Sequence, residues 1–178
     1  MSKNNTDTVS IRPINSTDAS ALLKLVKVLI TESDTFTLDT NLKYYSVEQQ
    51  VIAINEIQAT TTNVIFVAAY KDQLIGLATI QPTLHDNKQG EIGVAVLKAF
   101  QGNKLAQALI DESIYWAESY STLNNLFLSV QVQNAPAIHI YQKFNFEVIP
   151  ASTRTITLKN NKTVTTFDMQ FDLTPLIG

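Results

Sequence analysis

The 178-residue chain contains no cysteine, and this absence removes several kinds of chemistry at once. Without thiols there is no disulfide framework, no thiolate metal site and no cysteine nucleophile. A run of about 18 apolar residues is also missing, so no transmembrane helix is expected. Residues 1–8 are polar and lack the apolar stretch of a signal peptide. We therefore expect a frayed tail and a cytoplasmic protein.

Positive charge is in short supply as well. Thirteen Lys and Arg residues against 16 Asp and Glu residues leave a net charge of −3, which disfavours nucleic-acid binding because that function normally needs a basic face. Hydrophobic residues make up 45% of the chain and charged residues 16%, as in a compact globule. The length is that of about one domain, and neither repeats nor linkers interrupt it. We expect residues 9–178 to form a single domain after the tail 1–8.

Apolar periodicity predicts an α/β domain. Helical patterns cover residues 18–29, 47–57 and 102–120 and a short segment after Asn134, and a loop is expected over 31–45. Strand-like runs cover 9–13, 64–70, 74–81, 91–96, 126–132, a segment beginning at 146, and then 154–158 and 163–171. Hairpins at each side and a strand–helix–strand order in the centre predict a mixed sheet with helices on both faces.

Glycine is scarce, and its placement is informative. Three of the five glycines lie between residues 90 and 102, in a strand that leads through a loop into a helix. The start of a helix presents unpaired N–H groups and the positive end of its dipole, which suit phosphate. Gly102 permits close approach of an anion, and Lys104 adds positive charge. The segment predicts an anion site, with an ordinary strand-to-helix turn as the alternative.

Residues Gln101-Gly102-Asn103-Lys104-Leu105-Ala106 resemble the acetyl-CoA-binding motif of the GNAT-type N-acetyltransferases. That motif is Gln or Arg, two residues, Gly, one residue, then Gly or Ala. Gln101 and Ala106 fit, whereas Lys104 stands where the family has its more constant glycine. The lysine either crowds the loop or replaces a backbone contact with a charge contact.

A second stretch resembles another signature of the same family. The spacing of Asn134, Ala137, Tyr141, Lys143 and Phe146 agrees with it. Asn145 replaces a glycine at the end of a helix, where asparagine is the non-glycine residue best suited to a left-handed backbone. The order of elements from 9 to 173 agrees too. The resemblance implies a mixed, mostly antiparallel sheet of about seven strands flanked by about four helices, with a splayed central pair of parallel strands.

The resemblance also implies a position for acetyl-CoA, as co-substrate, in the gap between those two parallel strands. Val94, Ala95 and Val96 would then bond the thioester and the pantetheine. The amides of Gln101, Gly102, Asn103, Lys104, Leu105 and Ala106 would hold the pyrophosphate. Asn134 would contact the cofactor arm, and a plain helix cap is the alternative for it.

Two catalytic residues follow from the same resemblance. Tyr141 falls at the position of the general acid, where its hydroxyl can protonate the departing CoA thiolate; a tyrosine packed on the core is the alternative. Glu91 can take the proton of the acceptor amine, with a solvated residue at a strand edge as the alternative. The loop 31–45 carries acidic and aromatic residues that suit a cationic amine, unless it is simply a solvated loop.

The leading hypothesis is therefore transfer of an acetyl group from acetyl-CoA to a primary amine, by direct attack in a ternary complex and without a metal. The expected partners are acetyl-CoA and an amine acceptor, with no nucleic acid and no membrane, and a homodimer is left open. Lys104 motivates an alternative, an acyl-CoA-binding module of GNAT fold with little or no transferase activity.

Overall fold

The computed structural model describes residues 8–34 and 45–173. The predicted tail, apart from Thr8, lies outside the described residues, as does most of the predicted loop 31–45. In the described part of the chain the helices are α1 (Ala19–Glu32), α2 (Val47–Gln58), α3 (Leu105–Ser119) and α4 (Ala135–Lys143), with short 3₁₀ turns η1 (Ser16–Asp18) and η3 (Lys98–Phe100). None of these helices is long and apolar enough to cross a bilayer.

Local signals set the helix ends. Ser46 and Gln49 form the capping box that starts α2, since the Gln49 amide donates to Ser46 Oγ (3.1 Å) and the Ser46 amide donates to Gln49 Oε1 (3.0 Å). α1 continues through Thr31 and Glu32, so the loop predicted from Thr31 begins two residues later. The helix predicted from Gly102 begins at Leu105, because Gly102 and Lys104 have φ angles of 84° and 60° that no right-handed helix accepts.

The strands of the described residues form one mixed sheet. They are β1 (Ser10–Pro13), β2 (Val64–Tyr70), β3 (Gln73–Pro82), β4 (Gln89–Val96), β5 (Asn125–Gln131), β6 (Glu147–Val148), β7 (Arg154–Thr157) and β8 (Thr163–Asp172). The order across the sheet is β1-β2-β3-β4-β5-β8-β6, with β7 also paired to β8, and every pair is antiparallel except β4–β5. This confirms the predicted mixed, mostly antiparallel sheet, and the two-residue β6 brings the strands to eight.

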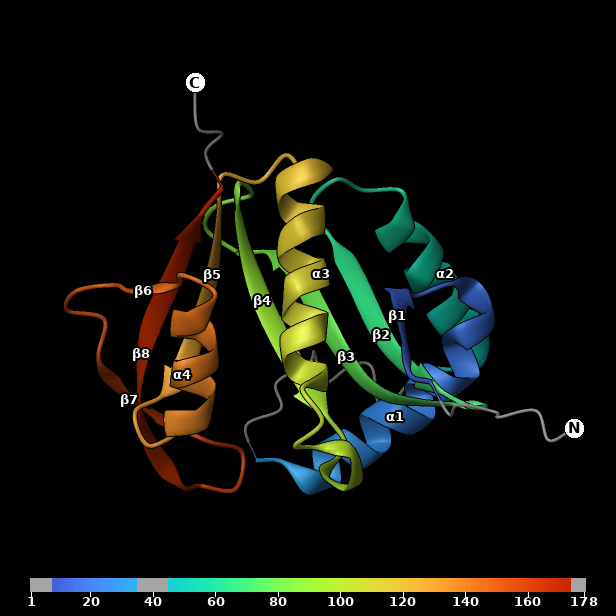
Figure 1. Ribbon diagram of the computed structural model, residues 1–178, viewed down its shortest axis with the longest axis horizontal. Helices are drawn as coiled ribbons and strands as arrows, with labels where there is room; N and C mark the ends of the chain where they lie inside the picture. The colour runs from blue at the N-terminus through green and yellow to red at the C-terminus, as the bar shows by residue number, and fades with distance from the viewer. Residues whose placement is uncertain (1–7, 35–44, 174–178) are drawn as a thin grey trace, which may run out of the picture.

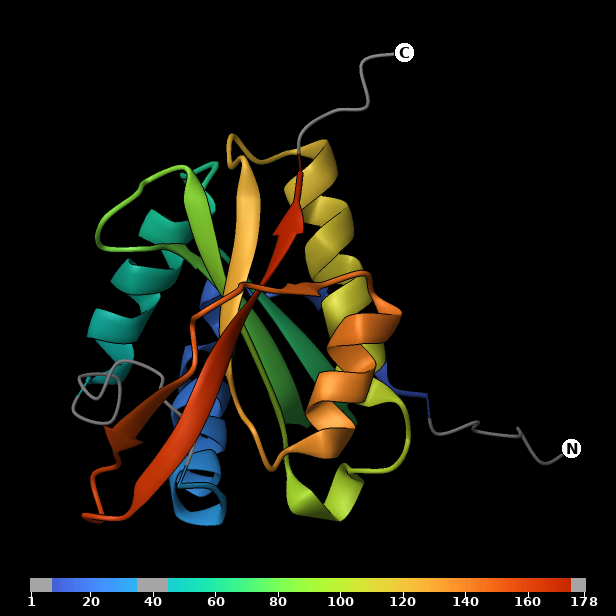
Figure 2. The ribbon, with the colours of Figure 1, turned by 90° about the vertical axis from the view of Figure 1, so that its left-hand side faces the viewer.

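The sheet lies between two layers of helices, as Figures 1 and 2 show, and each face of the sheet carries its own apolar core. α1 and α2 cover one face, where Leu22, Leu25 and Ile54 pack against side chains of β2 and β3. α3 and α4 cover the other face. α3 lies against β2, β3 and β4, and its Leu109 and Ile110 belong to a core that extends to buried side chains of β5 and β8. The prediction of helices on both faces is confirmed, and the two faces give the central strands two different surroundings.

Candidate active site

The parallel pair β4–β5 holds together only at its beginning. Residues 89–91 pair with residues 125–127, whereas β4 stays paired with β3 as far as Val96 and β5 stays paired with β8 as far as Gln131. Beyond Glu91 and Phe127 the two strands separate, and the backbone groups that face the gap have no strand partner there. The splayed central pair predicted from the sequence is thus confirmed.

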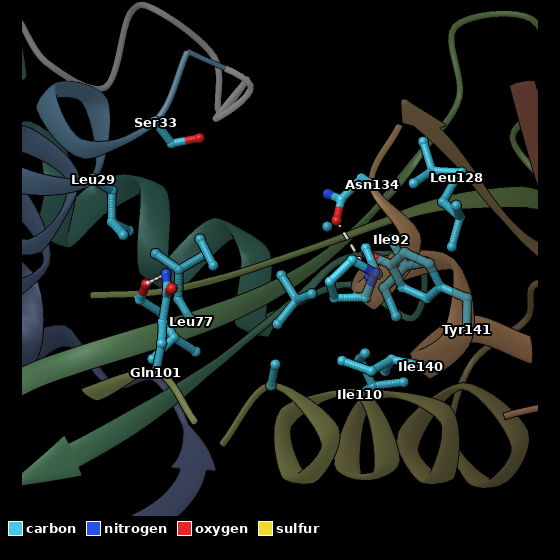
Figure 3. Close-up of a pocket in the computed structure, with 18 of the residues that line it drawn as sticks. Leu29, Ser33, Leu77, Ile92, Gln101, Ile110, Leu128, Asn134, Ile140 and Tyr141 are labelled. Atoms are coloured by element: carbon cyan, nitrogen blue, oxygen red, sulfur yellow. Dashed lines mark hydrogen bonds between the residues drawn. The ribbon is translucent and has the colours of Figure 1, made fainter. Parts of the chain in front are cut away.

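A cavity of about 730 Å³ lies at this gap and is lined from both faces of the sheet. Ile110, Ile140 and Tyr141 line it from the side of α3 and α4, and Leu29 and Ser33 line it from the side of α1 (Figure 3). Because the strands diverge, the cavity passes between them. A ligand on one face can therefore meet a ligand on the other.

The N-terminus of α3 opens on this cavity. The first hydrogen bond of the helix runs from the Ala108 amide to Lys104 O (3.1 Å), so the amides of residues 105–107 have no acceptor within the helix. The loop before the helix is braced, because Gln101 Nε2 donates to Val96 O (3.0 Å) and the Lys98 amide donates to Glu32 Oε2 (2.9 Å). A methyl group at Gly102 would meet no atom within 4 Å, which leaves open space at the turn.

Tyr141 reaches the cavity from α4. Asn134 caps that helix by accepting from the Ala137 amide (3.2 Å), and the Tyr141 ring packs edge-on against Phe146 with centroids 5.7 Å apart. Burial raises the pKa of the Tyr141 hydroxyl to about 12. The hydroxyl therefore keeps its proton at neutral pH, as a group that donates a proton must.

Glu91 lies at the end of β4 that still pairs with β5, and its side chain is on the α1/α2 face of the sheet, opposite to the face that carries Tyr141. It is opposite Gln81 on β3 and Phe127 on β5, and it shares the α1/α2 face with Ala95 because side chains alternate along a strand. Its side chain borders the cavity while remaining accessible to solvent. Partial desolvation, and then repulsion by Asp168, raise the pKa of the Glu91 carboxyl above its ordinary value. A raised pKa makes the carboxylate a stronger base.

Almost all the residues predicted for the site line this one cavity. They are Glu91, Val94, Ala95, Val96, Gln101, Gly102, Lys104, Leu105, Ala106, Asn134 and Tyr141. Asn103 does not line it, and its side-chain amide donates instead to Phe100 O (3.1 Å). Of the predicted acceptor loop, Glu32 and Ser33 border the cavity, whereas Phe36, Asp39 and Tyr44 lie outside the described residues.

The sequence reasoning missed polar residues that line the cavity from the same face of the sheet as Glu91. Thr79 and Gln81 on β3, Ser129 and Gln131 on β5, and Thr166 on β8 also line the cavity. Ser129 and Gln131 alternate with the buried Leu128 and Val130, and this alternation was a readable sign that one face of β5 is polar. Thr166 begins a similar alternation, Thr166-Phe167-Asp168-Met169-Gln170-Phe171, but only the pairing of β8 with β5 brings that polar face to the cavity.

The donor groups of this cavity fit acetyl-CoA. Unpaired amides at the start of α3 suit a pyrophosphate, the unpaired edges of β4 and β5 suit the amide groups of pantetheine, and apolar side chains from α3 and α4 suit its methylene chain. Within the described residues, no group of three or more His, Cys, Asp or Glu side chains is arranged to hold a metal ion.

A mixed sheet that opens between two parallel strands beside an exposed helix N-terminus defines a class of α/β domains that hold a phosphate-bearing ligand between strands. The chain belongs to the GNAT acetyltransferase family, whose model matches residues 31–146. Acetyltransferases of this family use acetyl-CoA as the acetyl donor.

Individual relatives agree with this assignment. The L-amino acid N-acetyltransferase AaaT of Escherichia coli (strain K12) is 28% identical over 105 residues, which is 58% of this chain and 64% of that enzyme, so less than two thirds of its length is matched. A GNAT-family acetyltransferase from Streptococcus pneumoniae has the same fold (TM-score 0.82, 22% identity, 93% of this chain and 99% of that one). So has yncA, a putative acetyltransferase from Salmonella typhimurium with its cofactor acetyl-CoA (TM-score 0.77, 17% identity, 96% of both chains).

Proposed function

We propose that this protein transfers the acetyl group of acetyl-CoA to a primary amine by direct attack in a ternary complex. The observation that carries the proposal is the single cavity that passes through the sheet, with the open N-terminus of α3 and Tyr141 on one face and Glu91 on the other. Acetyl-CoA supplies the activated acyl group when it is bound. The amine then has a separate approach, from the face of α1 and α2.

Residues of α3, α4 and β4 would bind the cofactor. Amides of residues 101–106 would hold the pyrophosphate together with the ammonium group of Lys104, and Asn134 would contact the cofactor arm. The β4 backbone between Val94 and Val96 has no β5 partner, so its inward N–H groups would donate to the thioester oxygen as charge develops there. The rigid pairing of β4 with β3 holds these donors in place.

Proton transfers would be handled by the two titrating side chains. Glu91 would accept the proton of the attacking amine, directly or through a water molecule. Tyr141 would give its proton to the departing thiolate, and a hydroxyl with a pKa of about 12 stays protonated until that moment. Base and acid come from opposite faces of the sheet, which matches an amine arriving on one side and a sulfur leaving on the other.

The alternative, an acyl-CoA-binding module without transferase activity, was motivated by Lys104. Lys104 has φ 60° and ψ 19°, the left-handed conformation that a glycine would take at this position. The loop backbone can therefore keep the shape expected of the family, which removes the ground on which Lys104 motivated the binding module. An amine rather than a nucleic-acid partner is in keeping with the net charge of −3. The cytoplasmic location and the homodimer stay predictions.

Replacing the phenolic hydroxyl tests the proposal. Tyr141→Phe should lower kcat by about 10²- to 10⁴-fold, the usual contribution of a general acid, with acetyl-CoA affinity unchanged by calorimetry. CoA release on a panel of primary amines measures turnover, and Tyr115→Phe, at an exposed tyrosine on α3, is the matched control. Full turnover by Tyr141→Phe would remove the acid role, and absence of acetyl-CoA binding at millimolar cofactor would remove the proposed function.

A further inference from the structure

A hydrogen-bonded cluster joins β5, β7 and β8 on the same face as Glu91. Arg154 Nη1 donates to Asp168 Oδ2 (2.7 Å), Arg154 Nη2 donates to Ser129 Oγ (3.0 Å), and Ser129 Oγ donates to Asp168 Oδ1 (2.6 Å). The Asp168 amide also donates to Ser152 Oγ (2.9 Å). We refer to Arg154, Ser129, Asp168 and Ser152 as the Arg154 cluster. Both oxygens of the Asp168 carboxylate are thus satisfied within it.

The strand register places this cluster beside the proposed base. Ser129 is directly opposite Asp168, and it lies two residues along β5 from Phe127, which is opposite Glu91. Residues opposite one another, and residues two apart on a strand, share a face. Ser129 lines the same cavity as Glu91. The electrostatic effect of Asp168 on the Glu91 carboxyl agrees with this proximity.

The cluster holds a negative charge near Glu91 and a positive charge that compensates it. The Asp168 side chain is only 13% exposed, whereas that of Arg154 is 46% exposed. A nearly buried carboxylate is weakly screened by solvent, so its field depends on the guanidinium that pairs with it. Without that guanidinium the Asp168 charge would act on Glu91 at full strength.

Most of the other groups near Glu91 add little to the electrostatic potential at its carboxyl. Its neighbours across the strands, Gln81 and Phe127, are uncharged. Glu32 borders the same cavity from α1, but one of its carboxylate oxygens accepts from the Lys98 amide (2.9 Å). The register also brings two more carboxylates to this face, Glu147 on β6, opposite Gln170, and Asp172 on β8. Asp168 is the one whose repulsion raises the pKa of the Glu91 carboxyl, and Arg154 is the cation paired with it.

We infer that Arg154 is a positioning residue for catalysis: it neutralises Asp168 and thereby keeps the Glu91 carboxyl ready to accept a proton at neutral pH. The inference rests on the proposed role of Glu91 as base. Arg154 and Asp168 both lie beyond residues 31–146, the part of the chain that the family model matches. The Arg154 cluster therefore draws its charged pair from outside the segment that the family model matches.

A direct titration tests the inference without relying on activity. The side-chain carboxyl of Glu91 is followed by carbon NMR against pH in the full chain, with Glu91→Gln used to assign the signal. Arg154→Gln should move the Glu91 midpoint upward by about half a pH unit, the scale of one partly screened charge on a neighbouring strand. Arg154→Lys, which keeps the charge, should leave it nearly in place. Asp168→Asn should move it downward, because the repulsion is gone.

The same variants should change the pH dependence of catalysis in parallel. The acidic limb of kcat/KM should move up in Arg154→Gln, stay in Arg154→Lys and move down in Asp168→Asn, with acetyl-CoA affinity unchanged in all three. Lys162→Gln removes one positive charge from the same hairpin, at an exposed position outside the cluster, and should move neither titration. Melting curves identify any variant that loses the fold. If Arg154→Gln does so, Arg154→Lys and Asp168→Asn still test the inference against the wild type.

The possible failures are distinct. A Glu91 midpoint that is unchanged in both Arg154→Gln and Asp168→Asn would overturn the inference, whatever the activity. An equal shift in Lys162→Gln would overturn it too, because net charge alone would then explain the effect. If the midpoints move as expected but Glu91→Gln keeps full turnover, the electrostatic coupling between Arg154, Asp168 and Glu91 is real. In that case Glu91 is not the base, and Arg154 has no role in catalysis.

Discussion

Two residues of this chain stand where its relatives are expected to have glycine, and both take a glycine-like backbone. Lys104 has φ 60° and Asn145 has φ 65°. The left-handed region costs a residue with a side chain more than it costs glycine, and asparagine tolerates it better than lysine does. Lys104 therefore adds a conformational free-energy cost at the proposed pyrophosphate site, and an attraction between its ammonium group and the phosphates would offset this cost.

Lys104 should contribute to cofactor affinity through its charge. Lys104→Gln is expected to weaken acetyl-CoA binding about threefold, as for one exposed charge contact, with a larger loss at low salt. Lys104→Gly should lose the same affinity but gain about 0.5–1 kcal/mol of stability, because glycine relieves the left-handed backbone. Calorimetry at two salt concentrations and thermal melts measure both effects, with Lys159→Gln as the charge control. Tighter binding in either Lys104 variant would mean that the lysine crowds the site.

Glu91 should set the acidic limit of the activity. The pKa of its carboxyl is raised, so the base becomes protonated, and activity falls, at a higher pH than for an ordinary glutamate. Glu91→Gln should remove this limb and lower kcat/KM by about 10²-fold or more. A carboxyl with a raised pKa favours the fold below its unfolded pKa, and this contribution is lost as the pH rises. The variant should thus melt at the same temperature as the wild type or higher at neutral pH, and a lower value would point to a structural role.

At the scale of single residues, the spacing along the chain was enough to predict residues that the structure brings to one cavity, whereas contacts that depend on strand pairing could not be predicted. Asn134 and Tyr141 are two turns apart on one short helix, so their spacing alone brings them to one cavity. Arg154 and Asp168 act through the register of β7 and β8, which depends on side-chain packing over the whole sheet. No spacing along the chain encodes that register.

At the scale of the elements, Gly90 lies in the short segment where β4 and β5 pair before they diverge. A Cβ at this position would lie 2.6 Å from Leu123 Cδ1 and 2.9 Å from Ile80 Cγ2, both of them side chains of the core. The absence of a side chain therefore lets the two parallel strands approach where they pair. Gly93, three residues further along the open part of β4, has only Thr79 Oγ1 near its Cβ position, at 3.5 Å.

This contrast predicts opposite outcomes for the same substitution. Gly90→Ala should destabilise the protein by about 1–3 kcal/mol, the usual cost of overpacking a core. Gly93→Ala should leave stability within about 0.5 kcal/mol, because its methyl group finds ordinary space. Urea unfolding of both variants gives the comparison. An equally small effect of both substitutions would mean that the flexible end of Leu123 moves aside and that the paired end of β4 and β5 is more loosely packed than its contacts indicate.

The strands and helices were predictable where one local pattern dominates. Residues 64–70 alternate too little to show a face, yet their apolar, β-branched composition located β2 at both ends. The start of α3 was predicted three residues early: residues 102–104 carry no apolar side chain that would mark the boundary, and the positive φ angles of Gly102 and Lys104 exclude these residues from the helix. The insertion of β8 between β5 and β6 could not be predicted, since it joins residues distant in the chain.

At the scale of the whole molecule, the sheet acts as a partition with one opening. The open N-terminus of α3 lies on one face and the polar row around Glu91 and Ser129 lies on the other. The two proposed substrates would therefore enter from different sides and meet between β4 and β5. Neither has to leave before the other binds, because their approaches do not overlap.

This arrangement predicts direct transfer, without an acetylated form of the protein. The chain has no cysteine, and Tyr141, with a hydroxyl pKa of about 12, is protonated and a poor nucleophile at neutral pH. Initial rates measured against the amine at several fixed acetyl-CoA concentrations should give double-reciprocal lines that intersect, as required when both substrates are bound together. Parallel lines would indicate an acetylated intermediate. Mass spectrometry of Glu91→Gln mixed with acetyl-CoA is the independent check: a stoichiometric acetyl adduct in this slowed variant would exclude direct attack, because its base is missing and any covalent step before the amine would accumulate.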